Sequence, residues 1–138
     1  MIDVKKYAKR ALLIAILLLM IYFFIPLYKF ITIKLERERN ILLAWSLQNH
    51  FRSKDLPNGE IKDIPLFFNE NISTFICENK WVDRWGEPLD IKVIKTDEAL
   101  TCTVISCGYR RFFFYREDIG VSIKTFFSSK RVKINYFP

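Results

Sequence analysis

The sequence contains one histidine, His50, and only four glycines among 138 residues. A Ser-His-Asp triad would have to use His50, and no positioned nucleophile accompanies it. Four scattered glycines leave no glycine-rich loop that could cradle a phosphate. Glu117 and Asp118 are adjacent in the chain, so their side chains diverge instead of forming an acid–base pair. The sequence therefore predicts a protein that is not an enzyme.

Cysteine is also scarce, with Cys77, Cys102 and Cys107 the only three. They lack the paired C-x-x-C spacing of a zinc site, so we expect no structural metal of that kind. An odd count allows at most one internal disulfide and leaves one thiol over. Cys102 and Cys107 are five residues apart in an apparent strand and point to opposite faces. We therefore expect a disulfide between Cys77 and either Cys102 or Cys107.

No dense basic block is present, although the formal net charge is +7. The first ten residues contribute +3, because four basic residues there oppose the single acidic residue Asp3. The remaining +4 is spread over 128 residues, which is not the footprint of a nucleic-acid-binding face. We expect no nucleic acid among the partners.

A long hydrophobic run, by contrast, is present from Ala11 to Ile33, with Lys29 as its only charge. About 20 apolar residues suffice for a helix to cross a bilayer, so residues 11–33 are predicted to be a transmembrane helix. A cleaved secretory signal is the alternative. The run is longer than the usual apolar core of about 7–15 residues and no small-x-small site follows, which favours an uncleaved membrane anchor.

The charges before this run predict its orientation. Lys5, Lys6, Lys9 and Arg10 lie just ahead of it, and positive flanks stay on the cytoplasmic side. Residues 1–10 are therefore expected in the cytoplasm and residues 55–138 on the other side of the membrane, in a protein that crosses it once. A membrane is thus the first expected partner.

The helix is predicted to continue beyond the bilayer through residues 34–54, which contain no glycine or proline. Leu43, Leu47 and Phe51 recur at four-residue spacing and predict one buried face. The charges of residues 36–39 alternate in sign, which is typical of a solvated turn. A helix from about Lys9 to Ser53 would be roughly 70 Å long at 1.5 Å per residue. Pro26 lies within it and predicts a kink, because proline removes a backbone hydrogen bond.

The rest of the chain predicts a small head domain. Pro57, Asn58 and Gly59 end the helix, and Pro65 could open a short helix that points Leu66, Phe67 and Phe68 inward. Four alternating or β-branched segments then predict an antiparallel sheet, with turns at 96–98 and 128–129. The expected fold class is α+β: a long N-terminal membrane-spanning helix packed on a small antiparallel sheet. The four segments are residues 89–95, 99–106, 118–127 and 130–137.

A rigid corner is expected between Asp83 and Leu89. Gly86 permits a backbone angle that other residues resist, and Pro88 fixes the direction of the following strand. Asp83 can accept hydrogen bonds from backbone N–H groups of the turn, and Trp85 offers a large apolar anchor. These features predict a structural corner without chemistry of its own.

The corner sequence "DRWGEPL" resembles the D-P-W-G-x-P motif of type II secretion major pseudopilins and their type IV pilin-like relatives. The order of segments is similar as well: a proline-containing membrane helix, an Asn-Gly turn, the corner and a small sheet. Ser106, Gly108, Asp118 and Ile119 match a second, degenerate motif. The resemblance implies a pilin-like fold and a structural subunit that contacts other such subunits through its N-terminal helix, in a homo-oligomer or a mixed assembly.

The chain departs from that family at two places. In the family a short basic leader is followed by Gly-Phe-Thr-Leu-x-Glu. No such Gly-Phe pair occurs in residues 5–17 of this sequence, and Lys9 stands near the position of the glutamate. The family's second motif binds calcium, but here Arg110 replaces its first acidic position and only Glu117 and Asp118 remain. Calcium prefers about six to eight oxygen ligands, so we expect no cofactor, with calcium the one candidate.

The aromatic run Phe112, Phe113, Phe114 and Tyr115 cannot all face one core if it is extended, because alternate side chains leave opposite sides of a strand. One pair is a candidate partner contact, unless another element covers it. The expected function is a membrane-anchored, pseudopilin-like structural subunit. The alternative is a membrane-tethered periplasmic binding module that does not polymerise.

Overall fold

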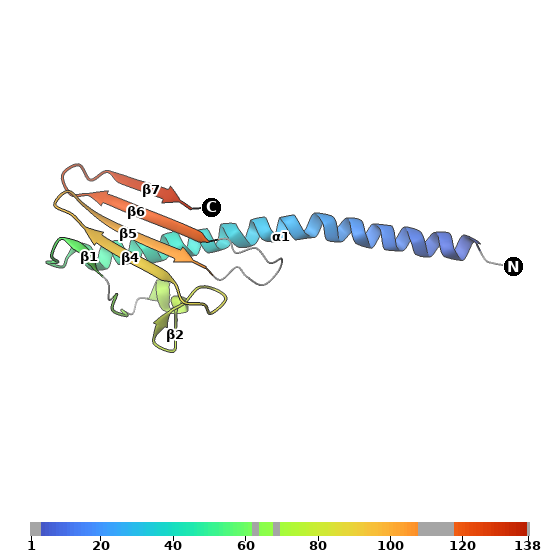
Figure 1. Ribbon diagram of the computed structural model, residues 1–138, viewed down its shortest axis with the longest axis horizontal. Helices are drawn as coiled ribbons and strands as arrows, with labels where there is room; N and C mark the ends of the chain where they lie inside the picture. Colours follow the sequence, from blue (N-terminus) through green and yellow to red (C-terminus); the bar gives the residue numbers. More distant parts are fainter. Residues whose placement is uncertain (1–3, 62–63, 68–69, 108–117, 138) are drawn as a thin grey trace. The chain divides into compact units, whose positions relative to one another are not determined.

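The computed structural model describes residues 4–61, 64–67, 70–107 and 118–137 (Figure 1). The chain divides into two compact units, Met1–Lys34 and Leu35–Pro138. We call them the span unit and the head unit. Helix α1 (Val4–Arg52) runs from the first into the second, so its last turns are part of the head unit.

Helix α1 contains 49 residues, with Pro26 inside it and no glycine. Its span-unit part is rich in leucine, isoleucine and alanine, and the first and last of these are strong helix formers. The helix ends at Arg52, where the N–H of Lys54 donates to the carbonyl of Phe51 at 3.2 Å. The turn residues that the sequence predicts, 57–59, come after residues 53–56, and Gly59 is the first residue of the next strand.

The head unit contains a five-stranded antiparallel sheet in the order β1-β4-β5-β6-β7. The predicted fold class, α+β with the long helix packed on a small antiparallel sheet, is confirmed. All four predicted strand segments are present, and the sequence did not predict the short edge strand β1. The strands are β1 (Gly59–Ile61), β4 (Asp90–Lys95), β5 (Ala99–Ser106), β6 (Ile119–Phe126) and β7 (Val132–Tyr136).

Both predicted hairpin turns are observed. Thr96 closes the first, because its N–H and its hydroxyl both donate to the carbonyl of Ala99. The second spans residues 127–130 and is closed by the N–H of Phe126, which donates to the carbonyl of Arg131 at 3.0 Å.

The core lies between one face of the sheet and the C-terminal part of α1. Leu43 and Leu47 are fully buried, and Phe51 is nearly so, as their four-residue spacing predicts. Complete burial of each leucine contributes about 1.5–3 kcal/mol relative to exposure. Their sheet partners are alternate residues of three strands: Val93, Leu100, Cys102, Val104, Val121 and Ile123.

The segment before the corner differs from its prediction. No helix begins at Pro65: residues 64–67 have no regular structure, and Leu66 and Phe67 are half-buried. A 3-10 helix, η1 (Glu70–Phe75), follows instead and buries Ile72 and Phe75. Phe68, which the sequence also placed inward, lies outside the described residues. The helix starts later because the buried side chains that it supplies come later in the chain.

A two-stranded hairpin, β2 (Ile76–Cys77) and β3 (Lys80–Trp81), then leads into the corner (Figure 1). Its two loop residues, Glu78 and Asn79, have φ angles of 48° and 62°. Two positive φ angles define the tight turn that matches strand twist, and Asn-Gly is its usual signal. Glu-Asn carries that signal weakly, so the sequence did not predict this hairpin.

Candidate functional site

The corner is held by one carboxylate. The Oδ1 atom of Asp83 accepts hydrogen bonds from the N–H groups of Trp85 and Glu87, each at 2.9 Å. The N–H of Asp83 donates to the carbonyl of Glu87 at 2.8 Å, which closes the loop on itself. Gly86 has a φ of +81°, in the left-handed region where a side chain would be strained. Asp83 and Gly86 therefore have the roles that the sequence predicts for them.

The exit from the corner is set by Pro88, which forms an isolated antiparallel bridge with Val82. The N–H of the next residue, Leu89, donates to the carbonyl of Trp81 at 3.1 Å. The segment that leaves the corner, Pro88 and Leu89, thus runs antiparallel to the segment that enters it, Trp81 and Val82. Strand β4 begins at the next residue, Asp90.

The apolar anchor of the corner is Trp81 and not Trp85, which corrects the sequence prediction. Trp81 is 8% exposed and its ring lies 5.5 Å from that of Phe67, edge to face. Trp85 is half-buried, with the guanidinium of Arg84 5.8 Å from its ring centroid. The reason is periodicity: Trp81 ends strand β3 with its side chain toward the core, whereas Trp85 lies in the turn.

The second oxygen of Asp83 connects the corner to the sheet. Its Oδ2 accepts a hydrogen bond from the hydroxyl of Ser106 at 2.9 Å, and both residues are buried. Ser106 is the last residue of β5, so the bond ties the corner to a central strand. Glu36 of α1 lies next to this pair, and we call the three residues the carboxylate cluster: Glu36, Asp83 and Ser106.

Glu36 is fully buried, which contradicts the solvated turn that the sequence predicts for residues 36–39. Residues 36, 40, 43 and 47 are spaced by four, three and four, so they form one stripe along the helix that faces the sheet. Extending the stripe of Leu43 and Leu47 by two turns would have found Glu36. The alternating charges concealed it.

The charge of Glu36 is poorly compensated. Burial raises the pKa of this carboxyl above 4.5, Arg39 opposes that shift at 3.3 Å, and the nearby charge of Asp83 adds to it. Hydrogen bonds from Ser106 and from the backbone of Arg84 lower the pKa again, but the net shift is upward. One oxygen, Oε1, is buried with no hydrogen-bond partner among the described residues. The cluster therefore favours a protonated Glu36.

Two further polar residues of the same stripe bind the sheet backbone. Asn40 donates to the carbonyl of Ile119 at 2.9 Å. Gln48 donates to the carbonyls of Leu100 and Ile123, each at 2.8 Å. These buried amides fix where α1 lies along β5 and β6, because each reaches a particular carbonyl.

The carboxylate cluster has the chemical groups of an acid–base site, but these groups are buried. Glu36 and Ser106 have no exposed surface. Asp83 lines an open pocket but is only 2% exposed, so the cluster offers very little surface to a substrate in this structure. His50, the other candidate acid–base residue, is engaged in packing contacts. Its ring stacks on Phe67 with the centroids 4.0 Å apart, and its Nε2 lies 2.9 Å from the amine of Lys54. Burial and the charge of Lys54 lower the pKa of His50.

Metal binding has little support from the part of the chain that the structure describes, where no group of three or more His, Cys, Asp or Glu side chains could hold an ion. Asp118 is exposed just before β6. Glu117, the other candidate calcium ligand, lies outside the described residues, as do the candidate partner contacts Phe112, Phe113, Phe114 and Tyr115. The calcium expectation remains a prediction.

The expected disulfide is not formed, although all three cysteines are among the described residues. Cys102 lies in the centre of β5, points at α1 and is fully buried, so burial raises the pKa of its thiol to about 12. Cys77 is exposed on the β2–β3 hairpin, and Cys107 is half-buried just after β5. Alternation along β5 turns Cys102 into the core, and no disulfide joins Cys77 to Cys107 either, so both pairings that the sequence predicted are wrong.

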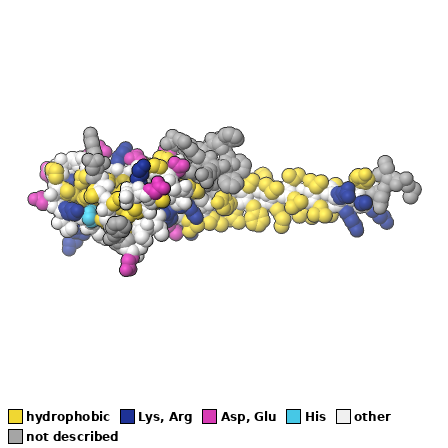
Figure 2. Space-filling view, turned by 90° about the horizontal axis from the view of Figure 1, so that it is seen from below, with side chains coloured by type: hydrophobic (Ala, Val, Ile, Leu, Met, Phe, Trp, Pro, Cys, Tyr) yellow, Lys and Arg dark blue, Asp and Glu magenta, His cyan; other side chains and the backbone are white. Residues whose placement is uncertain are grey.

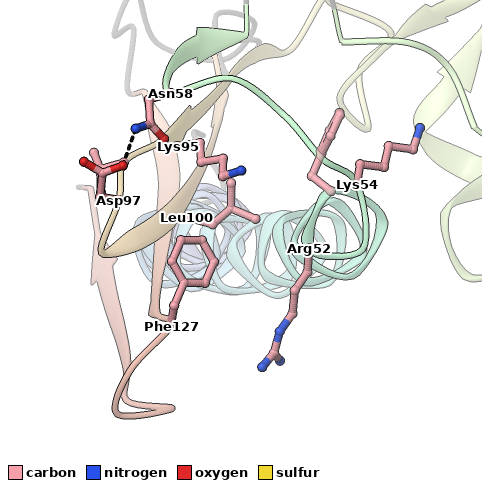
Figure 3. Close-up of a pocket in the computed structure, with 9 residues that line it drawn as sticks. Arg52, Lys54, Asn58, Lys95, Asp97, Leu100 and Phe127 are labelled. Carbon is pink, nitrogen blue, oxygen red and sulfur yellow. Dashed lines mark hydrogen bonds between the residues drawn. The ribbon is translucent and has the colours of Figure 1, made fainter.

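A pocket of about 360 Å³ lies beside the end of α1 (Figure 3), lined by Phe51, Arg52, Lys54, Asn58, Lys95, Thr96, Asp97, Leu100 and Phe127. Its cations do not converge, because Arg52 and Lys54 point away from each other (Figure 3). Lys95 donates to the carbonyl of Leu56 at 2.6 Å, and Asn58 donates to Asp97. These bonds hold the loop after α1 against the β4–β5 turn.

Replacing Glu36 with glutamine tests the carboxylate cluster. The raised pKa of Glu36 means that its stabilising neutral form is complete at acid pH and is lost as the pH rises through the folded-state pKa. We expect E36Q to be more stable than the wild type at neutral pH, on the order of 1 kcal/mol. The difference should vanish below pH 4.5, the ordinary value for glutamate.

The measurement is urea unfolding of the full chain in detergent, followed by tryptophan fluorescence across a pH series. Glu38 provides the matched control, since it is exposed on the same helix two residues away. E38Q should leave the pH dependence of stability unchanged. A stability difference between E36Q and wild type that does not vary with pH would contradict the assignment.

The chain matches no family model, no curated protein and no solved structure.

Proposed function

We propose that the protein is a membrane-anchored, pseudopilin-like structural subunit of a type II secretion or type IV pilus-like assembly. The observation that carries the proposal is the exposed apolar surface of α1 in the span unit. One helix is long and apolar enough to cross a membrane, and no part of its most apolar stretch is buried (Figure 2). The corner resemblance and the α+β fold support the pilin-like part of the proposal.

The span unit cannot stay bare in water. Its large apolar side chains between residues 12 and 31 are each at least 38% exposed, and they surround the helix on all sides. A soluble monomer rarely exposes a contiguous apolar patch larger than about 600 Å². Lipid, or other helices within lipid, is the environment that removes such a surface from water.

Orientation follows from charge. Lys5, Lys6, Lys9 and Arg10 lie on the first turns of α1, and Figure 2 shows basic side chains gathered near that end. The positive-inside rule places this end in the cytoplasm. The head unit is then on the periplasmic side of the inner membrane, where it would present its loops and sheet edges to other secretion-system subunits.

Two central arginines test the anchor. Each replacement of leucine by arginine at the middle of a membrane helix costs about 3–4 kcal/mol, so L17R/L18R should oppose insertion by roughly 6–8 kcal/mol. We expect the double variant to leave the membrane fraction after alkaline carbonate extraction. L17A/L18A, which removes the same two leucines without adding charge, should remain there. Retention of the arginine variant in the carbonate-resistant fraction would contradict the anchor.

A second candidate function is a tethered binding module that does not polymerise. Lys9 favours it, because pseudopilin-like subunits carry a glutamate near this position that registers one subunit against the next. The intact mass and N-terminal sequence of the membrane-extracted protein separate the two candidates. A trimmed, N-methylated terminus near Lys5 to Lys9, with the protein in shear-released fibres, is expected for a subunit. An unprocessed Met1 and a one-to-one complex that stays in the membrane would establish the tethered module instead.

A further inference from the structure

Strand β7 is an open edge of the sheet. It pairs with β6 on one side and with no other described strand, and all five of its residues are exposed. Edge strands are usually blunted by being very short, by proline, by bulges or by a covering element, because their free backbone groups can pair with another chain. A charged side chain can also blunt an edge strand, and Lys133 is the one charged residue of β7.

The hydrogen-bond pattern shows which backbone groups are free. The N–H of Phe137 donates to the carbonyl of Gly120, and the carbonyl of Arg131 accepts from Phe126. In an antiparallel pair, bonded and non-bonded residues alternate, so the odd-numbered residues of β7 face β6. The N–H and C=O groups of Val132, Ile134 and Tyr136 therefore point to the open edge.

The same three residues carry an apolar face. They lie opposite Thr125, Ile123 and Val121, whose side chains are buried on the helix side of the sheet. Val132, Ile134 and Tyr136 continue that face, but are 43%, 36% and 53% exposed.

Helix α1 lies beside this exposed apolar face of β7. Trp45 and Val132 line a cavity of about 100 Å³, and Arg37 lies 5.5 Å from the ring centroid of Tyr136. An added strand would therefore find apolar contacts on the helix side of the sheet.

The outer face of this edge is positively charged. Lys133 lies directly opposite Lys124, a like-charge pair that is destabilising on a sheet surface. Lys130 and Arg131 add two more positive charges in the turn, and residues 127–137 contain no acidic side chain. Lys124 also has Thr101 as its neighbour on β5, so no acid flanks the pair within the sheet. An acidic residue placed beside Lys133 would relieve the repulsion.

We propose that β7 binds an extended, acidic segment of a partner protein, which adds to the sheet as a sixth strand. Its backbone pairs with the free groups of Val132, Ile134 and Tyr136. Its apolar side chains alternate onto the helix side, and its acidic side chains lie beside Lys133 on the outer face. Main-chain hydrogen bonds supply the affinity of such added strands, and alternate side chains supply the specificity. This interaction goes beyond the proposed function and holds whether or not the chain polymerises.

Charge disfavours a second copy of this chain as the occupant. Antiparallel pairing of two β7 strands about Ile134 would place Lys133 of one copy opposite Asn135 of the other and Arg131 opposite Phe137, so no acidic side chain would face either basic residue. The opposite edge of the sheet, β1, carries Glu60 but has only three residues, and its Gly59 has a φ of +125°. A longer acidic segment satisfies all three free positions of β7.

A synthetic peptide provides the test. The probe is a fluorescent seven-residue peptide that alternates valine and glutamate, and its anisotropy is measured against the full chain in lipid nanodiscs. Empty nanodiscs correct for partition into lipid. The proposal expects saturable binding that weakens as salt is raised, since exposed charge pairs are screened. A peptide that alternates valine and lysine should bind more weakly.

The first variant is I134P. Proline removes an N–H that points to the open edge, so it leaves the bonds between β6 and β7 in place and blocks the added strand. We expect the peptide to bind at least roughly tenfold more weakly, because one hydrogen bond is lost and its acceptor is left unpaired. I134T retains the N–H and a β-branched side chain, and should bind nearly as well as wild type.

The second variant, K133E, does not depend on backbone tolerance. It should weaken the glutamate peptide's binding and reduce its advantage over the lysine peptide, because Lys124, Lys130 and Arg131 remain beside the new acid. Absence of saturable binding to the wild type, or equal binding by wild type, I134P and K133E, would overturn the proposal. Self-association of the wild type that I134P abolishes would overturn it too, because a second copy would then occupy the edge.

Discussion

The stripe of α1 from Glu36 to Phe51 covers the inner face of the sheet, and the rest of the head unit depends on it. Leu43, Leu47 and Phe51 supply its apolar contacts. Asn40 and Gln48 fix the position of the helix along the sheet, because their amides donate to three particular carbonyls of β5 and β6. A purely apolar stripe could slide along a flat sheet. Buried hydrogen bonds prevent that, since an unpaired polar group inside a protein costs about 1–3 kcal/mol.

The same stripe brings Glu36 to the corner, where its carboxylate is buried next to that of Asp83. Asp83 is well satisfied, with two backbone donors and the hydroxyl of Ser106. Glu36 has only the partly exposed Arg39 as a compensating charge. The carboxylate of Asp83 organises the corner. The carboxyl of Glu36 lies beside it, and burial and the charge of Asp83 make its ionised form unfavourable. The stability of the head unit is therefore linked to pH through Glu36.

Periodicity and turn chemistry predicted most of the architecture from sequence alone. The helix, its face through Leu43 and Phe51, the four long strands and both hairpin turns follow from local spacing. The errors have a common cause, which is tertiary context. Glu36 looked solvated because its neighbours alternate in sign, and Trp85 looked like an anchor because it lies in the motif. Cys102 looked available for pairing because alternation alone does not say which face of a strand a helix will cover.

The open edge of β7 could not be identified from sequence either. "VKINY" has the alternation of any half-buried strand, and only the strand order places it at the margin of the sheet. Once it is there, the pairing of Lys124 with Lys133 distinguishes it from an ordinary solvated edge. Sequence supplied the composition of this surface, and topology supplied its position.

Hydrogen exchange of the full chain in lipid nanodiscs, measured across increasing urea, tests the central claim that one helix has two separate supports. The amides of residues 36–51 should lose protection together with β4, β5 and β6, because the sheet holds that part of the helix. The amides of residues 12–31 should stay protected, because lipid holds them. Protection of residues 36–51 that outlasts the sheet, or loss of residues 12–31 along with the sheet, would contradict the account.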